Sequence, residues 1–232
     1  MKTNKEYKNE ALAALKGNWS QAVTAAILFV VAVDMSYFLL WGVEGAASLS
    51  LSVDSRGLFY VLSGLIILAD VLTGLILIPA SVIGLANVFN SFFIRPEGDM
   101  FRKMCSLTFS DIGRSVAGMI MMGIIISLYS LLLVVPGFVV SMSLFLVPYL
   151  LKDRPELTIF ETIRLSRKMM EGHKMQLFKL PLSFLGWALL NVLTLGIGAL
   201  WLLPYAMTTC AAFYQDVKAE YFMKEARQES AL

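Results

Sequence analysis

The feature that most constrains this sequence is a long apolar stretch near its C-terminal end, residues 175–215, in which Lys179 is the only charged residue. About 20 apolar residues cross the roughly 30 Å hydrocarbon core of a bilayer, so this stretch is too long for one span. Its only break is a cluster of small residues, Thr194, Gly196 and Gly198, which is typical of a tight turn. The sequence therefore predicts two transmembrane helices joined as a hairpin.

The whole chain of 232 residues follows the same pattern. It is 58% hydrophobic and only 16% charged, whereas a soluble domain has about 25% charged residues, so the composition indicates lipid as the solvent. We predict an all-α fold, a single integral membrane domain over 1–232, with six transmembrane helices arranged as three hairpins. The predicted spans are about 19–41, 72–93, 115–135, 138–151, 175–194 and 198–216.

Two of these boundaries depend on particular residues. The span at 72–93 is measured back from Arg95, with Pro79 expected to kink the helix rather than end it. Pro136-Gly137 is a strong turn signal and divides the uncharged run 115–151 into two spans. The second of these spans is short, because about 14 residues barely reach across a bilayer.

Three polar segments between the spans are expected to form interfacial amphipathic helices, at about 3–16, 96–112 and 156–171. Thr3 with Glu6, and Thr158 with Glu161, have the spacing of a capping box, which marks the start of a helix. Lysines on the first segment favour a position on anionic lipid headgroups. The alternative for that segment is a solvated lead-in to the first span.

The distribution of positive charge predicts the topology. The N-terminal segment, 95–114, 152–179 and the C-terminal tail contain every Lys and Arg of the chain, 19 in total, except Arg56. Because cytoplasmic loops of membrane proteins carry an excess of Lys and Arg, both termini are expected to be cytoplasmic. A single unbroken helix over 115–151 would move the basic segment 152–179 to the other side, which favours the division at Pro136-Gly137.

Motifs for catalysis are missing from the sequence. His173 is the only histidine, no phosphate-binding loop GxxxxGK[ST] is present, and Gly196-Ile197-Gly198 lacks the third glycine and the preceding strand of a dinucleotide fingerprint. We therefore predict a protein that is not an enzyme, with no catalytic, cofactor-binding or metal-binding residues, no cofactor and no nucleic-acid partner.

Two groups of charged residues are candidate sites. Arg164, Arg167, Lys168 and Lys174 could bind anionic lipid headgroups, at about 1 kcal/mol each; the alternative is that they only fix the orientation in the membrane. Asp34 and Asp70 lie near the predicted outer interface and could form an acidic vestibule for a cation, or they could simply lie in the headgroup region.

A series of short motifs resembles a known family. In order along the chain these are Lys16-Gly17-Asn18-Trp19, Val135-Pro136-Gly137, Ser166-Arg167-Lys168-Met169-Met170-Glu171-Gly172-His173-Lys174, Leu182-Ser183-Phe184-Leu185-Gly186-Trp187, Leu193-Thr194-Leu195-Gly196-Ile197-Gly198, Leu200-Trp201, Pro204-Tyr205 and Ala212-Phe213-Tyr214. Together they resemble the bacterial integral membrane family called domain of unknown function 975, most densely after residue 130. The resemblance implies a multi-pass protein of the bacterial cytoplasmic membrane. It brings no established activity and no catalytic residues.

Two functions follow as expectations. The first is a non-enzymatic membrane protein that acts through contacts with lipids or membrane partners, in envelope maintenance or protection. A membrane-protein partner or a second copy of the chain would be compatible with this role. The alternative is a transporter or channel for a small or lipid-like solute. Proline-broken spans favour the alternative, and the lack of a charge near the bilayer centre opposes it.

Overall fold

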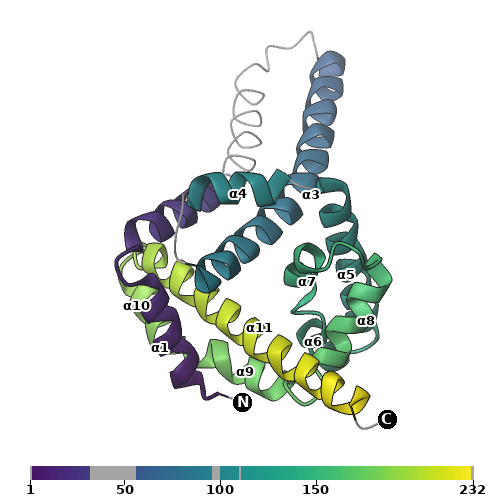
Figure 1. Cartoon of the computed structure of the whole chain (residues 1–232). Helices are drawn as coiled ribbons and strands as arrows, with labels where there is room; N and C mark the ends of the chain where they lie inside the picture. The colour runs from purple at the N-terminus through teal and green to yellow at the C-terminus, as the bar shows by residue number, and fades with distance from the viewer. Residues whose placement is uncertain (1, 32–55, 96–99, 110, 231–232) are drawn as a thin grey trace.

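The computed structural model describes residues 2–31, 56–95, 100–109 and 111–230 of the chain, and within these ranges it contains helices and no strand (Figure 1). The all-α prediction is therefore confirmed for the described residues. The helices are α1 (Asn4–Leu15), α3 (Arg56–Ile94), α4 (Met100–Phe109), α5 (Ile112–Leu132), α6 (Val134–Ser143), α7 (Val147–Asp153), α8 (Ile159–Met169), α9 (Lys174–Leu182), α10 (Leu185–Leu193) and α11 (Ala199–Glu229), with a further apolar helix at Trp19–Val31.

Helix α1 begins with the predicted capping box. The Glu6 amide donates to the Thr3 hydroxyl, while the Thr3 amide donates to the Glu6 carboxylate. Tyr7, Ala11 and Leu15, spaced four residues apart, are fully buried on one face. This face packs on α11, where the rings of Tyr7 and Phe213 meet edge to face at 5.8 Å. Protein therefore covers the apolar face of α1, and the predicted contact of its lysines with lipid headgroups stays a prediction.

Helix α3 is longer than the predicted span at 72–93. Its 39 residues correspond to about 58 Å at the rise of an α-helix, nearly twice a bilayer core. The helix continues through Pro79, as expected, and Figure 1 shows that its direction changes along its length. The C-terminal part is buried and packs against α4, where a Cβ on Gly84 would lie only 3.0 Å from the Cα of Thr108. Glycine is therefore required for this close approach.

The break between α5 and α6 falls at Leu133, whose backbone is extended (φ −161°, ψ 142°), and not at Pro136-Gly137. Pro136 instead lies in the first turn of α6, where the missing N–H would have no helical partner in any case. The division of 115–151 is confirmed, but its position is corrected by about three residues. Gly137 is needed as well, because a Cβ there would lie 2.8 Å from the Cα of Ser130 on α5.

The predicted short span at 138–151 is also corrected. Helices α6 and α7 follow one another through a tight turn at 144–146, in which amides bond to carbonyls three residues back. Together they give a 20-residue apolar segment, Val134–Asp153. This segment is long enough to cross a bilayer, unlike the 14-residue span that was predicted.

Helix α8 carries the second predicted capping box, with Thr158 as its N-cap and Glu161 reaching back to it. Its buried face includes Ile163 and Ser166, as the helical spacing predicts. The Ser166 hydroxyl donates to the carbonyl of Ser143 at 2.8 Å, which ties α8 to the end of α6. As with α1, the apolar face of this predicted interfacial helix lies against protein.

Between α10 and α11 the chain turns at residues 194–198, where the small-residue cluster predicted it. Leu195 and Gly196 adopt positive φ values of 52° and 90°, and the Gly198 amide donates to the Thr194 hydroxyl at 3.0 Å. Two details differ from the prediction. The span at 175–194 is interrupted by a turn at 183–184, and α11 continues well beyond residue 216.

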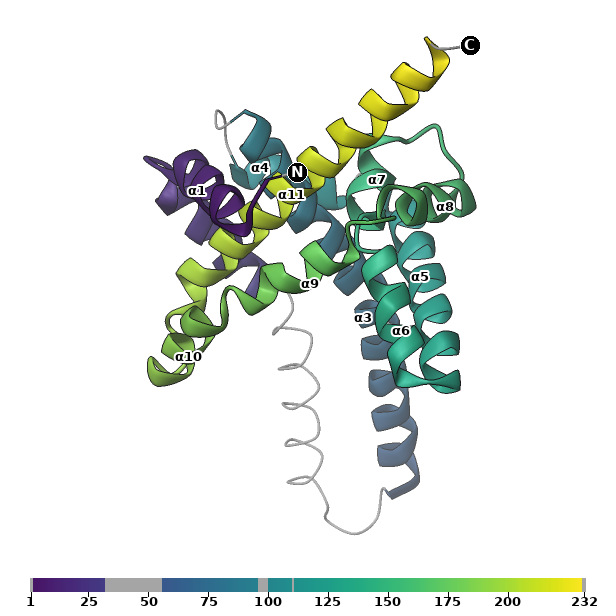
Figure 2. The same ribbon diagram turned by 90° about the horizontal axis from the view of Figure 1, so that it is seen from below.

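Four helical stretches are long and apolar enough to cross a membrane within the described part of the chain: Gly74–Ile94, Ile112–Leu132, Val134–Asp153 and Lys174–Leu193. In Figure 2 the start of α3 and the junction of α5 with α6 point the same way, away from α8 and the C-terminal end of α11. Six spans, three hairpins and cytoplasmic termini stay predictions. The segment predicted to span at 19–41 is described only as far as residue 31.

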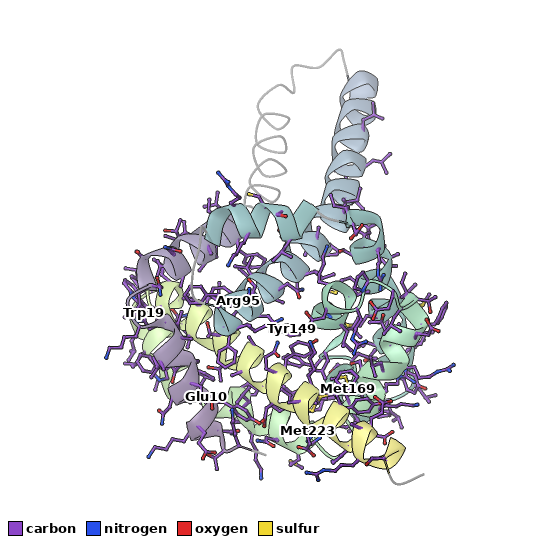
Figure 3. All side chains as sticks on the ribbon, viewed as in Figure 1. Glu10, Trp19, Arg95, Tyr149, Met169 and Met223 are labelled. Atoms are coloured by element: carbon purple, nitrogen blue, oxygen red, sulfur yellow. The ribbon has the colours of Figure 1, made fainter. Side chains whose placement is uncertain are left out.

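The core is centred on α11, which crosses the molecule between α1, α3 and α8. Its buried residues Phe213, Tyr214 and Val217 belong to a cluster that also contains Tyr149 and Met169. Figure 3 shows these last two side chains toward the interior of the ring of helices. We call the region formed by α1, α7, α8 and residues 205–221 of α11 the packed base.

Candidate lipid-contact site

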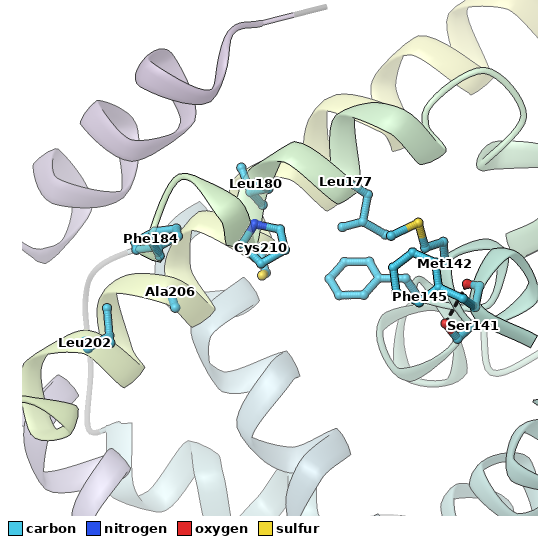
Figure 4. Close-up of a pocket in the computed structure, with 11 residues that line it drawn as sticks. Ser141, Met142, Phe145, Leu177, Leu180, Phe184, Leu202, Ala206 and Cys210 are labelled. Carbon is cyan, nitrogen blue, oxygen red and sulfur yellow. Dashed lines mark hydrogen bonds between the residues drawn. The ribbon is translucent and has the colours of Figure 1, made fainter. Parts of the chain in front are cut away.

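An apolar groove lies between α6, α9 and α11 and has a volume of about 470 Å³. Figure 4 shows residues from the three helices converging on it, with Phe184 and Leu202 toward one end and Met142 and Phe145 toward the other. Its lining residues are Phe138, Ser141, Met142, Phe145, Leu177, Leu180, Pro181, Phe184, Leu202, Ala206 and Cys210. The volume falls within the range of about 300–1,000 Å³ that is typical of ligand sites.

The groove offers almost no polar chemistry. The hydroxyl of Ser141 already donates to the carbonyl of Phe138 at 2.8 Å, as hydroxyls in apolar helices often do. Cys210 contributes a free thiol, and the other lining side chains are apolar. The lining therefore suits a hydrocarbon and leaves little with which to bind an ion or a polar solute.

A cation lies beside one wall of the groove. The Lys8 amine sits 4.1 Å from the ring centroid of Phe184 and donates to the carbonyl of Ser183 at 2.5 Å. Partial burial lowers the pKa of this amine from its usual value. Nothing in the sequence pattern pointed to Lys8 over the other lysines of its segment, because its neighbours Ser183 and Phe184 lie about 175 residues away in the chain.

The four basic residues predicted to bind headgroups are arranged along α8 and the start of α9. Arg164 and Lys168 are exposed and lie one turn apart on α8, whereas Arg167 and Lys174 are half-buried. The Nε atom of Arg167 is buried and has no hydrogen-bond partner among the described residues. The two exposed cations are therefore the ones free to meet a headgroup.

A second cavity, of about 340 Å³, lies between the end of α8 and the C-terminal part of α11. Lys168, Glu171, His173 and Lys224 are among its lining residues, so it is polar and carries both signs of charge. His173 lies 3.8 Å from Glu220, and burial lowers the pKa of the imidazole despite the opposing effect of that carboxylate. This cavity therefore differs from the groove, whose lining is apolar.

Two partly buried hydrogen-bonded pairs hold α11 in place, and neither was identified from the sequence. The Tyr214 hydroxyl donates to Asp153 at 2.5 Å, and Lys218 pairs with the same carboxylate oxygen at 2.6 Å. On the other side of α11, the Tyr7 hydroxyl donates to Asp216 at 2.6 Å. Burial, together with this carboxylate, raises the pKa of Tyr7.

The predicted acidic vestibule depends on Asp34 and Asp70. Asp34 lies outside the described residues, and for Asp70 only the backbone, within α3, is described. Among the residues that the structure does describe, no three His, Cys, Asp or Glu side chains are grouped so that they could hold a metal ion.

Comparison with known proteins identifies a family. The family model described as protein of unknown function, DUF975, matches residues 46–221, which is most of the chain. The chain belongs to this family. The resemblance inferred from the motifs is thereby confirmed, and the family description assigns no activity. Comparison with curated proteins and with solved structures finds no match for this DUF975 protein.

Proposed function

We propose that this DUF975 protein is a non-enzymatic, multi-pass protein of the bacterial cytoplasmic membrane that acts through contacts with lipids, in envelope maintenance or protection. The observation that carries the proposal is the large apolar surface of two regions, residues 128–139 and 185–197, which we call the apolar arms. Leu131 and Leu195 are 87% and 94% exposed there. Only 11% of the most apolar 18-residue stretch of Ile112–Leu132 is buried. Such surfaces are rare in water and normal in lipid.

The same proposal includes six spans with both termini in the cytoplasm. The clustering of Lys and Arg in the N-terminal segment, 95–114, 152–179 and the tail supports it through the positive-inside rule. A single cysteine introduced at Glu171, in a chain with Cys105 and Cys210 replaced by serine, tests the orientation. We expect an impermeant maleimide to label it only after the cells are opened. Labelling of intact cells would overturn the proposed orientation.

Headgroup binding by α8 is tested by charge reversal. In the double variant Arg164→Glu and Lys168→Glu, we expect the retention of anionic phospholipid, measured by native mass spectrometry of protein released from nanodiscs, to fall several-fold. Each lost cation removes about 1 kcal/mol of attraction to an anionic surface. The matched control, Lys5→Glu and Arg227→Glu, makes the same change in net charge on α1 and α11. Equal retention in both double variants would restrict the α8 cations to orienting the protein.

The second candidate function is transport of a lipid-like solute, and the apolar groove between α6, α9 and α11 is the observation that favours it. The lack of polar groups in the groove argues against an ion or a sugar as the solute. A dithionite assay with fluorescent phospholipid in proteoliposomes separates the candidates. Movement of lipid between leaflets that depends on the protein would favour transport, and its absence would favour the contact role.

A further inference from the structure

We propose that the groove between α6, α9 and α11 is a binding site for one acyl chain of an anionic phospholipid. This inference rests on the proposed function, because it assumes that the lining helices lie in a bilayer. It goes further by assigning a specific site and the part of the lipid that occupies it. The arguments are the chemistry of the lining, the continuity of the groove with the lipid-exposed surface, and a cation beside its wall.

The lining excludes most other occupants. Its one hydroxyl, on Ser141, already donates to the carbonyl of Phe138, so a polar solute would lose most of its hydrogen bonds to water without replacement. A hydrocarbon chain that comes from water gains about 25 cal/mol of free energy for each Å² of apolar surface that it buries. A chain that comes from lipid gains van der Waals contacts with the walls of the groove. Flexible and aromatic side chains such as Met142 and Phe145 are suited to a chain of variable shape.

The groove continues into a surface that the proposal assigns to lipid. Phe138 lines the groove and is also 49% exposed, and it lies within the first apolar arm, residues 128–139. Its ring packs edge to face on Phe178 of α9 at 5.8 Å, and Phe178 is itself partly exposed. An acyl chain can therefore enter the groove sideways from the surrounding lipid without leaving an apolar environment.

Lys8 determines the choice of an anionic lipid. Its amine lies against the face of Phe184, a lining residue, so the positive charge is one ring away from the groove. The amine has three N–H donors, and the described part of the chain gives it one hydrogen-bond acceptor, the Ser183 carbonyl. A phosphate placed next to it would complete its hydrogen bonds while the acyl chain fills the groove.

The experiment uses the full-length protein in nanodiscs of phosphatidylethanolamine and phosphatidylglycerol that contain a trace of phosphatidylglycerol with a diazirine in its acyl chain. After irradiation, the cross-linked peptides are mapped by mass spectrometry. We expect the label to concentrate on the groove-lining parts of α6, α9 and α11. In Ala206→Trp, which fills the groove from α11, labelling of these peptides should fall several-fold.

The control variant, Ala188→Trp, adds the same side chain on the exposed surface of α10 and should leave the labelling unchanged. If Ala206→Trp does not fold, Ser141→Phe fills the groove from α6 and is expected to have the same effect. In Lys8→Gln, labelling by the phosphatidylglycerol probe should decrease, while labelling by the corresponding phosphatidylcholine probe should not change.

The outcomes separate this inference from the proposed function. Label spread evenly over both apolar arms, with no loss in Ala206→Trp, would overturn the groove site and leave the lipid-contact role intact. Labelling of the groove that persists in Lys8→Gln would overturn the preference for an anionic lipid. Failure of the α8 charge-reversal test with normal groove labelling would contradict only the headgroup contacts of the proposed function.

Discussion

The packed base and the apolar arms are built from similar apolar side chains but are solvated differently. In the packed base, Phe213 and Tyr214 are fully buried, and the polar groups around them are paired across helices. In the apolar arms, Leu132 and Val134 are 76% and 80% exposed and contact little protein. The same kind of residue therefore stabilises the fold by packing in one region and by partition into lipid in the other.

This difference shows which residues determine a unique packing of the helices. Lipid tails are as apolar as leucine, so an arm gains little by burying its side chains against protein and has no unique partner. The base is fixed by directional contacts, such as Tyr214 with Asp153, which have only one arrangement. Stability should therefore depend strongly on substitutions in the base and weakly on those in the arms.

The largest expected effect comes from truncating the centre of the base. Phe213→Ala removes a fully buried ring that packs on Tyr7 and Phe145, at a cost of about 3–5 kcal/mol in unfolding free energy. Leu132→Ala, the matched truncation in an arm, should change it by less than about 0.5 kcal/mol. Denaturation by SDS in bicelles measures both. Equal costs would contradict the comparison and indicate that the arm is covered by a partner.

Within the arm, Gly137 is the exception that sharpens the comparison. Gly137→Ala places a methyl group against the backbone of Ser130 and should cost about 1–3 kcal/mol through overpacking. Gly123→Ala on α5, where the added Cβ would meet no other part of the protein within 4 Å beyond the adjacent helix backbone, should stabilise the helix by about 0.5–1 kcal/mol. The same SDS titration measures both the expected loss and the expected gain in unfolding free energy. A neutral Gly137→Ala would show that α5 and α6 can separate without cost.

A smaller effect is expected at the junction of α1 with α11. Tyr7→Phe removes the hydroxyl that donates to Asp216 and should cost about 1 kcal/mol. Because this hydrogen bond holds α1 on the base, hydrogen exchange of the α1 amides should become faster while that of α5 stays unchanged. Tyr129→Phe, at an exposed position in an arm, is the control and should change neither. Unchanged exchange in α1 would mean that ring packing alone holds the helix.

Local signals in the sequence predicted local structure well. The capping boxes at Thr3 and Thr158 and the turn at Gly196 were found because their determinants lie within a few residues of one another. The same applies to apolar helices, whose length follows from composition. The break at Leu133 was misplaced because Pro136 is as compatible with the first turn of a helix as with a turn between helices.

Features that depend on distant parts of the chain could not be predicted in the same way. An amphipathic segment such as α1 has an apolar face whether lipid or protein covers it, so its pattern could not reveal that α11 does. The pairing of Tyr214 with Asp153 joins residues 61 positions apart, and the groove is formed by three helices that are not consecutive in sequence. The basic residues of α8 were identified, but their unequal exposure follows from how α8 packs.

The smallest expected effect is a dependence of stability on pH, caused by His173 in the polar cavity between α8 and α11. Burial lowers the pKa of His173, the only histidine, below its usual value near 6.5, so folding favours the neutral imidazole. Its contribution to stability is complete above that value and is lost as the pH falls through it, because the unfolded chain then binds more protons. The hydrogen bond from Lys224 lowers the pKa of Glu220, so Glu220 stays ionised over this pH range and partly offsets the loss of stability.

The midpoint temperature of thermal unfolding should therefore decrease between about pH 7.5 and pH 5.5, and this decrease should be absent in His173→Gln. A midpoint that rises on acidification would mean that the pair with Glu220 outweighs burial, and would identify His173 as a stabilising cation rather than a buried neutral group.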